Sequence, residues 1–80
     1  MGFERKRDEF LPLVAPLLLD RSKRVRRFVT GVLGGWGDKR WSAFVPLDIL
    51  AEAHLKETDD RIRKWMGTLL EKRLLAEKAA

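Results

Sequence analysis

The side chains in this sequence that could bind a ligand are Lys and Arg, and they recur at equivalent positions of two similar segments. Lys23, Arg24 and Arg27 lie within one helical turn of each other, and Arg61 and Lys64 follow Arg24 and Arg27 at a distance of 37 residues. Aligned Lys and Arg side chains attract phosphate groups or an acidic protein surface. We therefore expect a basic helical face that binds nucleic acid or an acidic partner.

The excess positive charge is confined to the middle of the chain. Of the net charge of +5, all comes from residues 20–40, which hold seven basic and two acidic side chains. Lys39, Arg40 and Trp41 extend the candidate binding set, because an aromatic ring beside two cations suits contact with a base or a partner. The alternative is that the cations only keep a helix solvated or pair with acids of the next helix.

No group of residues predicts catalysis, a metal site or a cofactor. His54 is the only histidine and has no partner set for catalysis, and Asp59 and Asp60 stand where carboxylates cap a helix. The glycines at 34, 35 and 37 follow a helix and lack a Lys-Ser pair, so they form no phosphate loop. We expect a non-enzymatic protein without cofactor or metal.

Composition describes one small domain. The 80 residues are 45% hydrophobic and 36% charged, which favours a folded chain that does not span a membrane. The longest apolar run, residues 11–19, includes two prolines and is far shorter than the roughly 20 residues that cross a bilayer. The absence of cysteine is compatible with a reducing compartment, so a cytoplasmic location is the default expectation.

Apolar residues at three- and four-residue spacing predict an all-α fold of four helices. We expect the first from Asp8, as N-cap, to near Asp20, bent at Pro16, and the second from a cap at Ser22 to the glycines at 34–37. The third should cover about 43–56, and the fourth about 60–76 after a cap at Asp59. The predicted apolar stripes of the second and fourth helices contain Val25, Phe28, Val29, Val32, Leu33 and Trp36, and Ile62, Trp65, Met66, Leu69 and Leu70.

The chain is a duplication. Residues of about 8–36 form a first unit, 37–41 a linker, and about 42–76 a second unit that repeats the order Pro-containing helix, turn, amphipathic helix. Two such units predict two antiparallel helical hairpins, stacked so that each covers the apolar face of the other.

The two turns resemble those of HEAT repeats. The residues that carry this resemblance are D-x-S-x-x-V-R at 20–26 and E-x-D-x-x-I-R at 57–63. The resemblance implies a short α-solenoid with the second helices along one wall. It also implies that Arg26 and Arg63 are structural, each bonding to a turn carboxylate such as Asp20 or Glu57. DNA alkylation repair proteins with HEAT-like repeats are similar, which implies DNA binding along the basic wall, although their catalytic residues have no counterparts here.

The ends of a two-unit stack are expected to need a cover. Phe3 and Phe10 lie at one end, and Leu74 and Leu75 fall outside the predicted stripe at the other. We predict a homodimer formed by two-fold pairing of a terminal hairpin, against the alternative of a monomer. The leading function is therefore binding of a protein partner or of the chain itself. Nucleic-acid binding is the second hypothesis, and a purely structural repeat fragment or designed repeat is the third.

Overall fold

The computed structural model describes residues 2–36 and 39–79, with side chains for 8–34 and 41–78, and all regular elements in these residues are helical. The all-α prediction is confirmed for this part of the chain. None of the described helices is long and apolar enough to cross a membrane. In chain order the elements are α1 (Gly2–Val14), the 3-10 helix η1 (Ala15–Leu19), α2 (Lys23–Gly31), the π-helix η2 (Val32–Trp36), the 3-10 helix η3 (Lys39–Phe44), α3 (Leu47–Lys56) and α4 (Asp60–Ala79).

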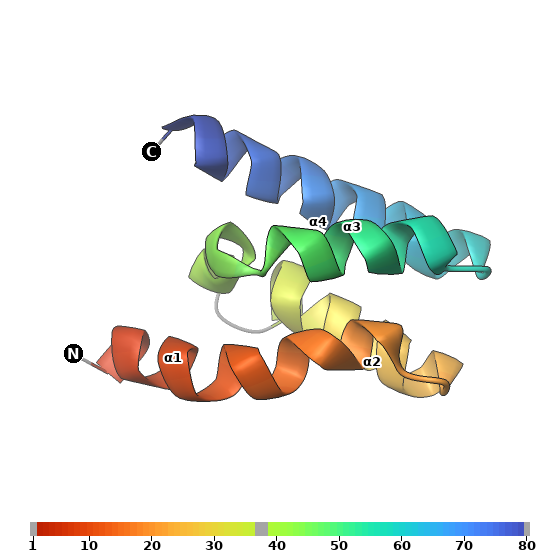
Figure 1. Cartoon of the computed structure of the whole chain (residues 1–80), viewed down its shortest axis with the longest axis horizontal. Coiled ribbons are helices and arrows are strands. Elements are labelled where there is room, and N and C mark those ends of the chain that lie inside the picture. Colours follow the sequence, from red (N-terminus) through yellow and green to blue (C-terminus); the bar gives the residue numbers. More distant parts are fainter. Residues whose placement is uncertain (1, 37–38, 80) are drawn as a thin grey trace.

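The chain runs out and back twice (Figure 1). It leaves along α1 and η1, returns along α2 and η2, leaves again along α3 and returns along α4. The turns before α2 and α4 lie at one end of the molecule, and both termini lie at the other. Contacts join η1 to α3 and α2 to α4, so helices of the first half pack against helices of the second.

The two predicted helix caps at the turns are confirmed. Ser22 Oγ accepts a hydrogen bond from the backbone N–H of Val25 at 3.3 Å, and Asp59 Oδ1 accepts one from Ile62 at 2.9 Å. Each bond satisfies an N–H group that has no partner within its own helix. Short polar side chains therefore start both of the helices that follow the turns.

The start of the first helix was predicted wrongly. Asp8 is no N-cap, because α1 begins six residues earlier at Gly2 and Asp8 lies exposed in its middle. Pro12 consequently sits inside α1, where it removes an intrahelical hydrogen bond. The break expected at Pro16 is seen, since the α-helix changes to the tighter η1 at Ala15.

Gly34 and Gly35 do not end the second helix as expected, and Gly37 lies outside the described residues. The helix widens at Val32 into η2 and continues through Gly34 to Trp36. No described glycine has a positive φ, so the left-handed residue that commonly ends a helix is absent from this part of the chain. Part of the predicted linker is also helical, and α3 begins at Leu47 after Pro46 rather than near residue 43.

One core joins the two halves. Most of the residues predicted in the apolar stripes contribute to this core. Phe28, however, is mostly exposed and Trp65 is only half-buried, so both are less buried than predicted. The buried apolar residues are Leu11, Ala15, Leu18, Val29, Leu33, Val45, Leu50, Ala53, Ile62, Met66 and Leu69.

Candidate functional site

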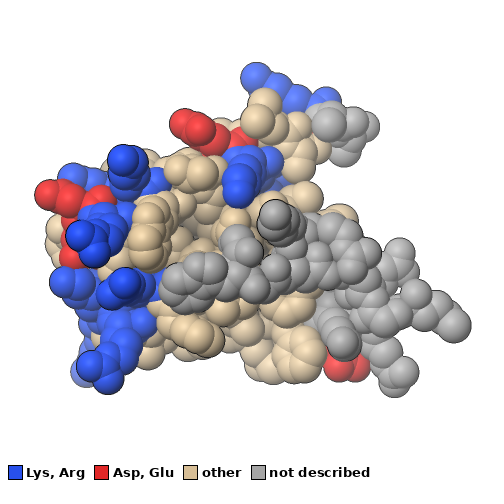
Figure 2. Space-filling model, turned by 180° about the vertical axis from the view of Figure 1, so that it is seen from behind, with Lys and Arg blue, Asp and Glu red and all other residues tan. Residues whose placement is uncertain are grey.

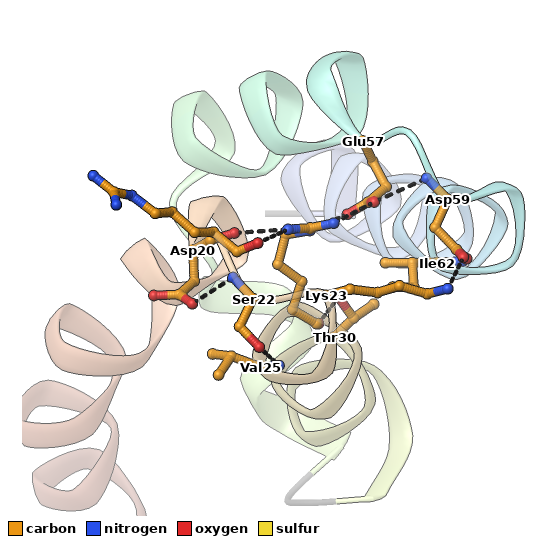
Figure 3. A network of polar contacts seen from close by, with 10 residues as sticks. Asp20, Ser22, Lys23, Val25, Thr30, Glu57, Asp59 and Ile62 are labelled. Atoms are coloured by element: carbon orange, nitrogen blue, oxygen red, sulfur yellow. Dashed lines mark hydrogen bonds and ion pairs between the residues drawn. The ribbon is translucent and has the colours of Figure 1, made fainter.

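Figure 3 shows a network of polar contacts between the turn at Asp20 and Ser22 and the turn at Glu57 and Asp59. Arg26 links these two turns. Its Nε and Nη2 donate to Glu57 Oε1 at 2.8 Å and Oε2 at 3.2 Å, a two-point contact between guanidinium and carboxylate. Its Nη1 also donates to the backbone carbonyls of Asp20 at 2.8 Å and Arg21 at 2.9 Å. Arg26 therefore contacts the carboxylate of the other turn and two backbone carbonyls of its own turn.

The two turns share the hydrogen bond of the carboxylate that begins each of them. Asp20 Oδ2 accepts from the backbone N–H of Ser22 at 2.9 Å, and Glu57 Oε2 accepts from that of Asp59 at 3.0 Å. Each turn therefore begins with a carboxylate that accepts from the N–H two residues later. The matching residues of the two turns therefore make the same local hydrogen bond.

The remaining turn residues are less equivalent. Arg63, the counterpart of Arg26, donates to Asp60 on the same exposed helix surface rather than to another turn. Lys23, expected on the binding face, forms an ion pair with Asp59 at 2.9 Å, which adds a second link between the halves. Lys23 therefore has a partner inside the chain.

The turn carboxylates are held in their charged forms. Burial alone would raise the pKa of Glu57, but the hydrogen bonds from Arg26 and from the N–H of Asp59 bring this pKa below its usual range. The N–H of Ile62, and then Lys23, lower the pKa of Asp59 to about 2. Both carboxylates therefore stabilise the fold only while they remain ionised.

This arrangement predicts acid sensitivity. Asp59 takes up its proton near pH 3.8 in the unfolded chain but near pH 2 in the folded one, so its contribution is complete above that window and disappears within it. We expect the thermal midpoint to fall as the pH is lowered through this range. The Asp59→Asn variant keeps a capping oxygen but cannot titrate, so its midpoint should depend less on pH. Identical pH profiles for both proteins would contradict the assignment.

Basic side chains gather at the turn end of the face formed by α2 and α4. Figure 2 shows this cluster of Lys and Arg from behind, with acidic side chains beside it. Arg24, Arg27, Arg61 and Lys64 are all exposed, as the sequence predicts. Within the described residues, no ion pair is seen for these four side chains. Their charges are therefore not neutralised by a described carboxylate.

A groove lies next to this basic cluster, between α2 and α4. It has a volume of about 250 Å³, and its lining is mostly apolar. This is smaller than the roughly 300–1,000 Å³ of small-molecule sites, so it fits a side chain better than a cofactor. The lining residues are Thr30, Gly31, Gly34, Trp65, Thr68, Leu69 and Lys72.

The groove has a cation at each end. The guanidinium carbon of Arg27 lies 5.7 Å from the centre of the Trp65 ring, a cation–π contact between α2 and α4. At the other end, Lys72 Nζ donates to the carbonyl of Gly34 at 3.2 Å. Lys72 was missed from the sequence, although it follows Arg61, Trp65 and Thr68 along one side of α4 at helical spacing.

The other predicted site residues are scattered. Trp41 is half-buried and packs against the core, and the side chains of Lys39, Arg40 and Phe3 lie outside the described residues. Phe10, Leu74 and Leu75 are exposed, as a self-association surface requires.

His54 is half-buried against Gly67, where an added Cβ would lie 3.3 Å from its Nε2. This close packing places His54 at the boundary between α3 and α4.

Comparisons with known proteins give no relative for this chain. No protein-family model matches it, and no curated protein and no solved structure matches it either.

Proposed function

We propose that this chain is a non-enzymatic interaction module of two HEAT-like repeats, stacked as a short α-solenoid, that binds an acidic segment of another protein. The binding surface is the face of α2 and α4. The observation that carries the proposal is the apolar groove with a cation at each end. The repeat architecture is supported by the matching hydrogen bonds of the two turns and by the Arg26–Glu57 link between them.

The floor of the groove suits an apolar side chain better than a phosphate. Both floor hydroxyls already donate within the chain, Thr30 Oγ1 to Arg26 O at 2.7 Å and Thr68 Oγ1 to Lys64 O at 3.2 Å. The floor therefore offers a phosphate no free hydroxyl donor, whereas an apolar side chain would gain contact with Trp65 and Leu69.

The charges around the groove define the rest of the ligand. Arg24, Arg27 and Arg61 are at the turn end and Lys72 is at the far end. A complementary segment places a leucine, phenylalanine or tryptophan in the groove and Asp or Glu residues on both sides of it. Nucleic-acid binding is the second candidate function, and it is favoured by the cluster of four exposed cations, which have no ion pair among the described residues.

A peptide-display selection against the purified chain tests both functions. The proposal expects enriched peptides to carry acidic residues on each side of one large apolar residue. The strongest of them should bind more tightly than a DNA duplex at physiological salt. Enriched peptides without acidic residues, or a duplex that outcompetes all of them, would contradict protein binding by this face.

Charge-reversal variants should distinguish binding at the face of α2 and α4 from nonspecific electrostatic attraction. The double variant Arg27→Glu, Lys64→Glu is expected to bind the selected peptide at least about a hundredfold more weakly, because like charges then face each other. The control Lys56→Glu, Lys78→Glu has the same net charge but lies away from the groove, so it should change affinity by less than about tenfold. Fluorescence anisotropy titrations measure the affinity of each double variant for the selected peptide. Equal losses of affinity in both variants would mean that only the net charge of the chain determines binding.

A third variant tests the groove without touching its charges. A Cβ at Gly34 meets nothing within 4 Å, so Gly34→Leu can be accommodated and should fill the groove. We expect this variant to keep its thermal midpoint and to bind the selected peptide at least about tenfold more weakly. Unchanged affinity would place the peptide elsewhere.

A further inference from the structure

The residues that join the two halves have counterparts elsewhere in the chain that make no such contact. Inside the molecule, Leu18 and Arg26 of the first half meet Ala53 and Glu57 of the second around one small cleft. Leu55 lies two residues before its turn carboxylate, as Leu18 does, and Arg63 is the counterpart of Arg26. Leu55 and Arg63 of the second half therefore correspond to Leu18 and Arg26, the residues by which the first half contacts the second.

Exposure shows that this second surface is uncovered. The exposed fraction is 1% for Leu18 but 85% for Leu55, and 16% for the side chain of Arg26 but 51% for that of Arg63. The Leu74 side chain, which lies on the same side of α4 as Arg63 by helical spacing, is also exposed. Leu55 and Leu74 therefore offer apolar area beside Arg63 that another copy could bury.

The opposite end of the chain offers the matching half of the contact. Asp20 has the place that Glu57 has in its turn, and its Oδ2 accepts from the N–H two residues later in the same way. Pro16, Leu13 and Leu17 on the neighbouring helices are exposed and apolar. The Asp20 carboxylate can pair with Arg63 of another copy, and the apolar surface beside it can contact Leu55 of that copy.

We infer that copies of this chain associate head to tail, with Arg63 and Leu55 of one copy docked on Asp20 and the exposed side of α1 and η1 of the next. Arg63 needs only to leave Asp60, and ion pairs between side chains as exposed as these contribute little. The two surfaces are different, so the contact does not close on itself and adds copies one after another. This inference goes beyond the peptide groove on α2 and α4 and does not depend on it.

Sedimentation velocity over a range of concentrations tests the inference. Head-to-tail association predicts an average mass that rises from 9.3 kDa without a plateau. Two-fold pairing of a terminal hairpin, the geometry expected from the sequence, would instead stop at a dimer. A mass that stays at 9.3 kDa at all concentrations, or that levels off at the dimer, would overturn the head-to-tail arrangement.

Single substitutions test which residues form the contact between two copies. Leu55→Glu should remain monomeric and folded, because the side chain is exposed within one copy, whereas Leu75→Glu, on another side of α4, should still associate. Arg63→Glu and Asp20→Arg should each abolish association when alone, and an equimolar mixture of the two should restore it, since every junction then joins opposite charges. Association of either chain alone as strong as that of the mixture would refute the pairing of Arg63 with Asp20.

Discussion

Replacing Arg26 by alanine is expected to destabilise the fold by about 3 kcal/mol, near the lower end of the range for breaking a buried ion pair. The reason is the position of Glu57, whose side chain is fully buried and whose carboxylate would lose its two-point contact with the guanidinium. Two backbone carbonyls would also lose their donor. Small domains have a total stability of only about 5–15 kcal/mol, so this loss is a large fraction of the total and should lower the unfolding midpoint clearly.

The arginine at the matching place in the second turn sequence provides the control. Arg63→Ala is the same chemical change at the equivalent position, but the side chain is exposed and its only described ion pair is with the exposed Asp60. We expect a change of less than about 1 kcal/mol. Urea titrations followed by circular dichroism compare the two variants. Similar midpoints would mean that the Arg26 contact does not hold the two turns together.

Truncation of Leu50 is expected to have the second large effect. Leu50 is fully buried in the core that joins the halves, and Leu→Ala at such a site costs about 2–5 kcal/mol. Leu55→Ala, on the same helix α3 but exposed, should change stability by less than about 0.5 kcal/mol at concentrations where the chain is monomeric. Thermal unfolding that lowers both midpoints equally would show that the packing around α3 is not as described.

The features that sequence predicted well are those decided by short spacings. Ser22 and Asp59 were placed correctly as caps because each needs only a short polar side chain three residues before the N–H that it accepts from. The exposed cations of α2 and α4 follow equally from helical spacing. Each of these features depends on one helix and its own turn.

The features that were missed depend on neighbours or on unusual winding. Helical spacing put Phe28 and Trp65 in the apolar stripes, but only the part of a stripe that faces another helix is buried. Gly34 was read as a helix end, whereas the helix passes through it as a π-helix without a left-handed residue. The groove arises only where Gly31 and Gly34 of one half face Trp65 and Thr68 of the other, so no single segment reveals it.

The most direct test of the proposed function is an NMR titration of the isotope-labelled chain with the acidic peptide obtained by selection. Binding in the groove predicts shifts of the amides of Gly31, Gly34 and Thr68 and of the Trp65 indole N–H. The Gly34→Leu variant should show these shifts only at much higher peptide concentrations. Shifts confined to residues outside α2 and α4, or shifts that Gly34→Leu leaves unchanged, would contradict binding of an acidic segment on this face.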